Sequence, residues 1–147
     1  MPALPTHPGP AADPSVVCPP CARCCKHVAV GVDAPTTVTR VSTLLWFVYH
    51  DGVSLYQSQE GDWFLNVPAS CENLRPDGLC GVYESRPLLC REYDVAGCEG
   101  TSEEPAEKLR FDDAAAFVAW LAARRPSLYR RCVEGGIVPE RLRAARP

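Results

Sequence analysis

Apolar residues recur along the chain at two different periods. Between residues 37 and 49 they fall at the spacing of one helix face, and Gly52 can supply the left-handed residue that follows many helices. Residues 53–57 and 62–67 instead alternate between apolar and polar, with turn residues between them, and predict a β-hairpin. A shorter alternation over residues 28–32 indicates another strand.

Helical spacing returns towards the C-terminus. Asp112 is placed to cap an alanine-rich helix over residues 113–124. Pro126 ends that helix and suits the first turn of the next one, over residues 127–134. The change of period from helix to strand and back predicts a small α+β fold.

Three segments lack such periodicity. Residues 1–17 are rich in proline and alanine, and we expect them to be extended or disordered because they offer little apolar surface to bury. Residues 101–107 are typical of a polar linker, and residues 135–147 of a basic tail with at most a fraying helical turn. We therefore predict one folded domain over residues 18–134.

Charge and hydropathy exclude several classes of protein. The 147 residues carry 15 Lys and Arg against 18 Asp and Glu, a net charge of −3, without the basic surface that nucleic-acid binding favours. No apolar run reaches the roughly 20 residues that cross a bilayer, and the N-terminus lacks the basic and apolar regions of a signal peptide. We expect a cytoplasmic protein that binds neither nucleic acid nor membrane.

Cysteine is the unusual component of the sequence, with nine residues. Cytosolic thiols stay reduced and nine is an odd number, so metal or redox chemistry explains them better than a disulfide framework. The alternative is a secreted domain held by disulfides. Thiolates suit zinc, cuprous copper and iron–sulfur clusters, whereas calcium and magnesium are poor matches.

Four cysteines form the run Cys18-x2-Cys21-x2-Cys24-Cys25. Each two-residue step allows a pair of thiolates to reach one metal from a tight turn. Adjacent side chains point in different directions on most backbones. Cys24 and Cys25 are therefore expected to serve different sub-sites or a bridged multinuclear centre.

The other ligands must come from far along the chain. The candidates are the cysteines of the second half: Cys71, Cys80, Cys90, Cys98 and, as an additional candidate, Cys132. We expect Cys18, Cys21 and Cys24 to lie near at least two of Cys71, Cys80, Cys90 and Cys98. Metal binding then contributes to folding, because such a site rarely exists in the unfolded chain.

Other side chains near the cysteines also matter for a thiolate site. Cations next to them offset thiolate charge, although each could equally be a surface group: Arg23, Lys26, Arg86 and Arg91. His27 follows the first run and is a further candidate ligand, but a lone histidine more often packs or faces solvent.

Residues 80–91 follow a second pattern, Cys-x-x-Tyr-x-x-Arg-Pro-x-x-Cys-Arg. Together with the first run, this block resembles the YkgJ-like cysteine-cluster family, also called the zinc- or iron-chelating CxxCxxCC domain. The resemblance covers residues 18–132. It implies a metal-binding protein, and some members of the family are described as iron–sulfur oxidoreductases.

The resemblance implies which residues form the site. The implied ligands are eight cysteines: Cys18, Cys21, Cys24, Cys25, Cys71, Cys80, Cys90 and Cys98. It also implies supporting roles for Tyr83, Arg86, Pro87 and Arg91. Pro87 would stiffen the turn before Cys90, and Arg91 would neutralise thiolate charge or brace the loop through its fork of donors.

Three functions follow from these residues. The first is a protein that coordinates zinc or iron, including iron in an iron–sulfur cluster, with the metal ion as its partner. The second is an enzyme that uses the cluster, either an oxidoreductase or a protein-modifying enzyme, although no catalytic motif is legible. The third is an adaptor whose fold is stapled by zinc and which binds a protein partner.

Overall fold

The computed structural model describes residues 22–92, 105 and 107–143. The predicted leader, residues 1–17, lies outside the described residues, as does most of the predicted linker over residues 101–107.

Contacts within the chain divide it into two compact units. We call the first the cysteine unit; it consists of Met1–His27 and Ala69–Ala106. The second, the sheet unit, consists of Val28–Pro68 and Glu107–Pro147.

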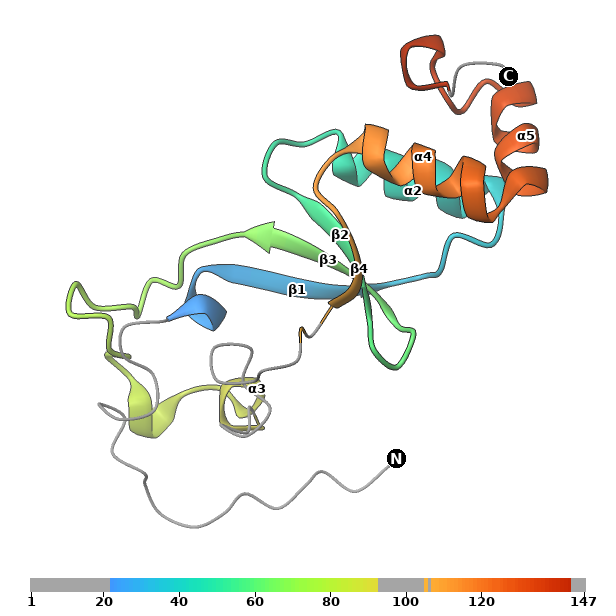
Figure 1. Ribbon diagram of the computed structural model, residues 1–147. Helices are drawn as coiled ribbons and strands as arrows, with labels where there is room; N and C mark the ends of the chain where they lie inside the picture. Colours follow the sequence, from blue (N-terminus) through green and yellow to red (C-terminus); the bar gives the residue numbers. More distant parts are fainter. Residues whose placement is uncertain (1–21, 93–104, 106, 144–147) are drawn as a thin grey trace. The chain divides into compact units, whose positions relative to one another are not determined.

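A four-stranded sheet lies in the sheet unit, and its first strand begins one residue before that unit (Figure 1). Its strands are β1 (His27–Val32), β2 (Ser54–Ser58), β3 (Trp63–Pro68) and β4 (Glu107–Phe111), in the order β1-β3-β2-β4. β2 runs antiparallel to both β3 and β4.

Register assigns the residues of each strand to the two faces of the sheet. Leu55 is paired with Leu65 on one side and Phe111 on the other, and all three side chains are buried. The next residue, Tyr56, is paired with Phe64, and their rings stack at 5.2 Å on the opposite face. The alternation seen in the sequence therefore separates a core face from an outer face.

The predicted hairpin is confirmed by the pairing of β2 with β3. Its turn is closed by the Ser58 N–H, which donates to the Asp62 carbonyl at 2.8 Å. Gly61 in this turn has a φ of 99°, a conformation that costs glycine little because it has no Cβ.

The first predicted helix is confirmed as α2 (Val38–Val48). The Thr37 side chain caps its N-terminus by accepting from the Arg40 N–H at 3.2 Å. The buried residues of α2 lie at helical spacing: Val41, Leu44, Leu45 and Val48. Gly52 is left-handed as expected, with a φ of 79°, but it lies three residues beyond the C-cap, in the turn that leads to β2.

The two C-terminal helices are α4 (Ala114–Arg124) and α5 (Pro126–Glu134), and Pro126 occupies the first turn of α5 as predicted. The predicted cap of α4 is wrong by one residue. Asp113, not Asp112, accepts from the Ala116 N–H, at 2.8 Å.

Strand β4 was not predicted by the sequence pattern. Three of its five residues are charged, and its first residue falls in the predicted linker. The structure explains how Arg110 is accommodated in it. Its guanidinium donates to Glu107 at 2.6 Å, to Asp112 at 2.7 Å and to the Ser54 hydroxyl at 2.9 Å. Asp112 therefore pairs with the strand instead of capping the helix.

The helices and the sheet share one apolar core. α5 packs against α2 and α4, while α2 contacts β2 and α4 contacts β4. Trp63 lies in this core, and its ring contacts those of Phe111 and Trp120. The α+β class is confirmed. No helix in the part of the chain that the structure describes is long and apolar enough to span a bilayer.

Candidate metal centre

Cys25 and Cys71 lie side by side because their backbones are hydrogen-bonded. The Cys71 N–H donates to the Cys25 carbonyl at 2.7 Å, and the Ala69 N–H donates to the Lys26 carbonyl at 3.0 Å. Two segments that are distant in the sequence are thereby fixed next to each other within the cysteine unit.

Cys24 and Cys25 are part of a tight 3-10 turn, Arg23–Cys25. Ala22, which precedes it, has a φ of 42°, a left-handed conformation that is uncommon outside glycine. A hydrogen bond joins the Cys24 and Cys25 side chains. The two thiols therefore lie close together in this turn, an arrangement that the bridged centre among the two expected alternatives requires.

Cys80 lies at the end of a short turn that reverses the chain direction after Leu74. Leu74 and Cys80 form an isolated antiparallel bridge, and the Gly81 N–H donates to the Asn73 carbonyl at 2.8 Å. Gly78 in this turn is left-handed, with a φ of 82°. The Leu74 N–H in turn donates to the Cys71 carbonyl at 3.1 Å, so Cys71 and Cys80 belong to the same small loop.

Pro87 sets the start of the short helix α3 (Leu88–Glu92), which carries Cys90. Its carbonyl accepts from the N–H groups of Cys90 at 3.0 Å and Arg91 at 3.2 Å. Arg86, just before the proline, is extended with a ψ of 152°, as the proline ring requires of the preceding residue. The Arg-Pro pair therefore fixes the point at which the chain turns into the helix.

Arg91 braces the loop before α3. Its Nε donates to the Arg86 carbonyl at 2.9 Å, and its second amino group donates to the Glu84 carbonyl at 2.8 Å. Arg86 itself is held over the Tyr83 ring, with the guanidinium carbon 3.7 Å from the ring centroid. The sequence pattern named these residues but gave no indication of this stacking.

The thiols of this unit influence one another electrostatically. Burial raises the pKa of Cys25, and the negative charges of Cys71, Cys80 and Cys90 raise it further, while the hydrogen bond from Cys24 opposes the shift. Like charges raise a thiol pKa only where they lie close to it. A cation bound among these sulfurs would relieve their mutual repulsion.

The described part of the structure holds some of the predicted ligands and not others. The described ones, none of which is in a disulfide bond, are Cys24, Cys25, Cys71, Cys80 and Cys90. Cys18, Cys21 and Cys98 lie outside the described residues. Among residues 22–92, 105 and 107–143, no group of three or more His, Cys, Asp or Glu side chains is arranged to hold a metal ion.

Cys132 has different surroundings from the other described cysteines. It lies on α5 with its side chain fully buried in the apolar core of the sheet unit. Burial raises the pKa of its thiol, and the nearby Arg131 opposes this shift. Its environment is that of a packed core residue. His27, the other additional candidate, is the half-buried first residue of β1.

The cysteine thiols fit zinc or iron, and a cation in the same sequence block, Arg86, suits a thiolate site. The Arg86 Nε atom is buried, and none of the described residues accepts a hydrogen bond from it. A buried charged donor without an acceptor is costly, so this N–H calls for an acceptor beyond those that the described residues supply. The sulfur of a metal-bound cysteine is an acceptor of that kind.

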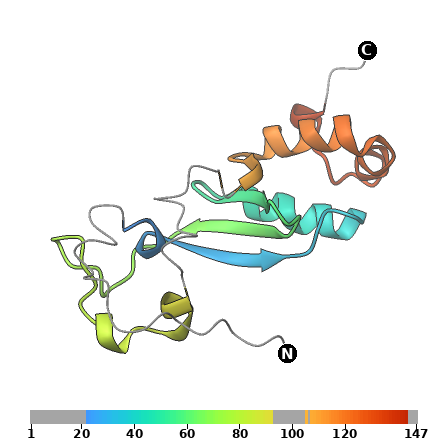
Figure 2. The same ribbon diagram turned by 60° about the horizontal axis from the view of Figure 1, so that its bottom comes forward.

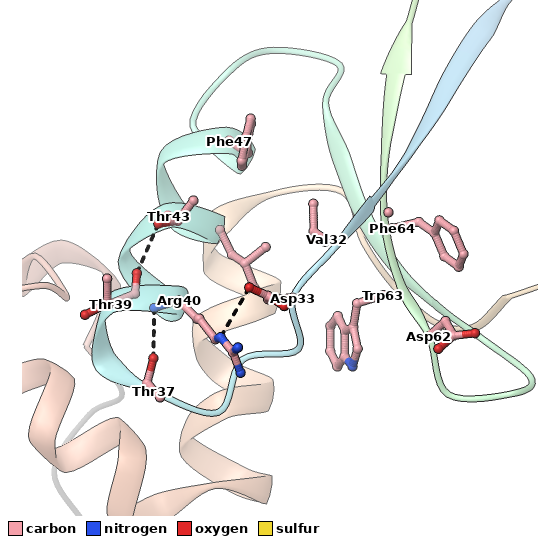
Figure 3. Close-up of a pocket in the computed structure, with 12 residues that line it drawn as sticks. Val32, Asp33, Thr37, Thr39, Arg40, Thr43, Phe47, Asp62, Trp63 and Phe64 are labelled. Atoms are coloured by element: carbon pink, nitrogen blue, oxygen red, sulfur yellow. Dashed lines mark hydrogen bonds and ion pairs between the residues drawn. The ribbon is translucent and has the colours of Figure 1, made fainter. Parts of the chain in front are cut away.

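A pocket of about 940 Å³ lies in the sheet unit, between α2 and the strands β1 and β3 (Figure 3). Several of its polar side chains already have partners: Arg40 pairs with Asp33 at 3.4 Å, and Thr43 donates to the Thr39 carbonyl at 3.1 Å. None of its lining residues is a predicted metal ligand. We therefore do not place the function there.

Cysteines brought from separate segments into one unit, a braced Arg-Pro turn and an arginine stacked on a tyrosine suit a cysteine-rich metal-binding domain. The family model CxxCxxCC, described as a putative zinc- or iron-chelating domain, matches residues 17–116. The chain belongs to this family, as its two motifs predicted. No curated protein and no solved structure matches it.

Proposed function

We propose that this protein binds zinc or iron through the thiolates of the cysteine unit. The observation that supports this most directly is the pairing of Cys25 with Cys71, with the charges of Cys80 and Cys90 acting on the same thiol. Soft sulfur donors gathered from distant segments select zinc or iron over hard cations. Cys18, Cys21 and Cys98 are proposed to complete the ligand set.

The neighbouring residues prepare the site. Arg91 holds the carbonyls of Glu84 and Arg86 in place, so the loop before Cys90 is rigid before metal arrives. Arg86, stacked on Tyr83, supplies a positive charge, and we propose that its buried Nε donates to a metal-bound sulfur. Outer donors of this type orient ligands and stabilise thiolate charge.

The test is metal quantification on protein purified without oxygen. We expect stoichiometric zinc in a colourless protein, or iron, with absorption near about 400 nm if the iron forms a cluster with sulfide. The Cys71→Ser variant should lose metal. The Cys132→Ala variant, which removes a thiol from the core instead, is the matched control and should keep its metal.

Two outcomes would overturn the proposal. One is a folded wild-type protein that contains neither metal and takes up neither on anaerobic reconstitution. The other is a Cys71→Ser variant that keeps full metal content together with the wild-type resistance to a chelator.

A further inference from the structure

The two edges of the sheet are protected to very different degrees. The β4 edge carries Glu107, Lys108 and Arg110, and Arg110 is tied to Glu107 at 2.6 Å. Charged side chains of this kind keep exposed edge strands from pairing with other chains. The β1 edge has none between residues 28 and 32, and Val28 and Val30 are 50% and 45% exposed.

An unprotected strand edge is a template for another strand, because its backbone N–H and C=O groups can complete a ladder. Among the described residues, β3 is the only neighbour of β1, so the second side of β1 carries no strand (Figure 2). We propose that this edge pairs antiparallel with β1 of a second copy of the chain, giving a two-fold symmetric dimer with a continuous sheet.

In one register, apolar residues of β1 lie opposite apolar residues on one face of the sheet, and small residues lie opposite small residues on the other face. In a two-fold pairing centred on Val30, that residue faces its own copy, Val28 faces Val32, and Ala29 faces Gly31. Each pair joins side chains on the same face of the sheet. Val32 already packs against the apolar core, so the exposed Val28 of the other copy is placed beside a covered apolar surface.

Charge favours the same register. It brings His27 opposite Asp33, whose side chain is 72% exposed although it pairs with Arg40 at 3.4 Å, so an imidazole meets a carboxylate at both ends of the paired strands. Moving the axis to Ala29 would set Lys26 opposite Val32. Moving it to Gly31 would set Ala29 opposite Asp33. In both of these shifted registers, His27 no longer lies opposite Asp33.

Pairing β1 with β4 of another copy would give a different assembly. Such a head-to-tail contact leaves one open edge at each end and grows into a filament instead of closing. The charged side chains of β4 oppose it. Closed dimers are therefore the expected assembly, and filaments are an outcome that would contradict the proposal.

The first test measures mass in solution. Light scattering after size exclusion should show a dimer fraction of the full-length, metal-loaded chain that rises with concentration. Val30→Lys places two ammonium groups opposite each other at the axis and should yield monomer. Val30→Thr keeps a β-branched strand residue and should still dimerise. Far-ultraviolet circular dichroism and metal content check that both variants are folded.

The second test measures register by cross-linking. Residues opposite each other in antiparallel strands have Cα atoms about 4.5–5.5 Å apart, which is within disulfide range. Mild oxidation of Val30→Cys should therefore link position 30 to itself, as identified by peptide mass spectrometry. Val28→Cys is the matched control. Its two copies lie about 13 Å apart in this register and should not link.

These results would overturn the proposal: a wild-type chain that stays monomeric up to about 1 mM, a dimer that Val30→Lys leaves intact, or equal self-linking at positions 28 and 30. The pairing needs no metal ligand. Failure of the metal-binding proposal is therefore seen separately, in the metal content.

Discussion

The guanidinium of Arg86 lies over the aromatic ring of Tyr83, with its central carbon 3.7 Å from the ring centroid. The carbonyl of the same arginine accepts from Arg91 at 2.9 Å. One cation of the block over residues 80–91 is thus held through its side chain and its backbone at once. This relationship gives Tyr83 a role that its position in the motif alone does not reveal.

Replacement of Tyr83 should therefore weaken metal binding. Tyr83→Leu removes the cation–π contact, worth about 0.5–2 kcal/mol, and should lower metal affinity about 2- to 30-fold. Tyr83→Phe keeps the ring and should behave like wild type. Competition with a chromophoric chelator measures both. An equal loss of metal affinity in the two variants would show that the Tyr83 hydroxyl, and not its ring, supports metal binding.

Arg91 should determine the rigidity of the loop before Cys90. Arg91→Ala removes two donors to backbone carbonyls at 2.8 and 2.9 Å, and should cost about 1–2 kcal/mol because the groups are partly exposed. Amide exchange over residues 84–91 should then be about 5- to 30-fold faster. Arg75→Ala is the control, since Arg75 pairs with the exposed Asp77 in a neighbouring turn. Unchanged exchange in Arg91→Ala would contradict the bracing role.

The burial of Cys132 predicts a dependence of stability on pH. Burial raises its pKa above the ordinary 9.0, so the folded chain keeps the proton at a pH where the unfolded chain releases it. This contribution to stability is present below about pH 9 and is lost as the pH rises through the folded pKa. Denaturation of wild type and Cys132→Ala from pH 7 to 10 should show a steeper decline in wild type.

The same cysteine should also be protected from reagents. Thiol labelling of the folded, metal-free chain should modify the exposed Cys24, Cys71 and Cys90 well before Cys132, as mapped by peptide mass spectrometry. Early labelling of Cys132 would contradict its place in the core.

The cap of α4 gives a prediction with an adjacent control. Asp113→Ala removes the acceptor for the Ala116 N–H and should lower the free energy of unfolding by about 1 kcal/mol. Asp112→Ala removes only an exposed ion pair with Arg110 and should cost less. Urea denaturation measures both, and a larger loss in Asp112→Ala would show that the cap lies where the sequence first suggested.

The fold was predictable where the signal is local. α2 and the β2–β3 hairpin follow from the spacing of apolar residues and from turn residues beside them. β4 could not be recognised in the same way, because its charged Arg110 is accommodated by Glu107 and Asp112, contacts that exist only once the strand has formed. The one-residue error at the α4 cap has the same origin.

The candidate site shows a similar division. Spacing singled out the cysteines as a group, because we expected a reducing compartment, where repeated cysteine spacing points to metal or redox chemistry. It could not show that the turn after Ala22 brings Cys24 and Cys25 together, because that turn depends on a left-handed backbone at an ordinary residue. Nor could it separate Cys132 from the others, because a buried free thiol packs like a small apolar side chain.

The division of the chain into two units has a consequence for how the protein can be made. Each unit is built from two stretches of sequence that interleave with those of the other, so the chain passes from one unit to the other after residues 27, 68 and 106. No single cut can therefore release either unit as a continuous fragment. During synthesis on the ribosome, Cys71, whose N–H bonds to the Cys25 carbonyl, emerges only after α2 and the β2–β3 hairpin. Strand β4, which completes the sheet, emerges only after Cys90. Neither unit can therefore be completed before part of the other has been synthesised.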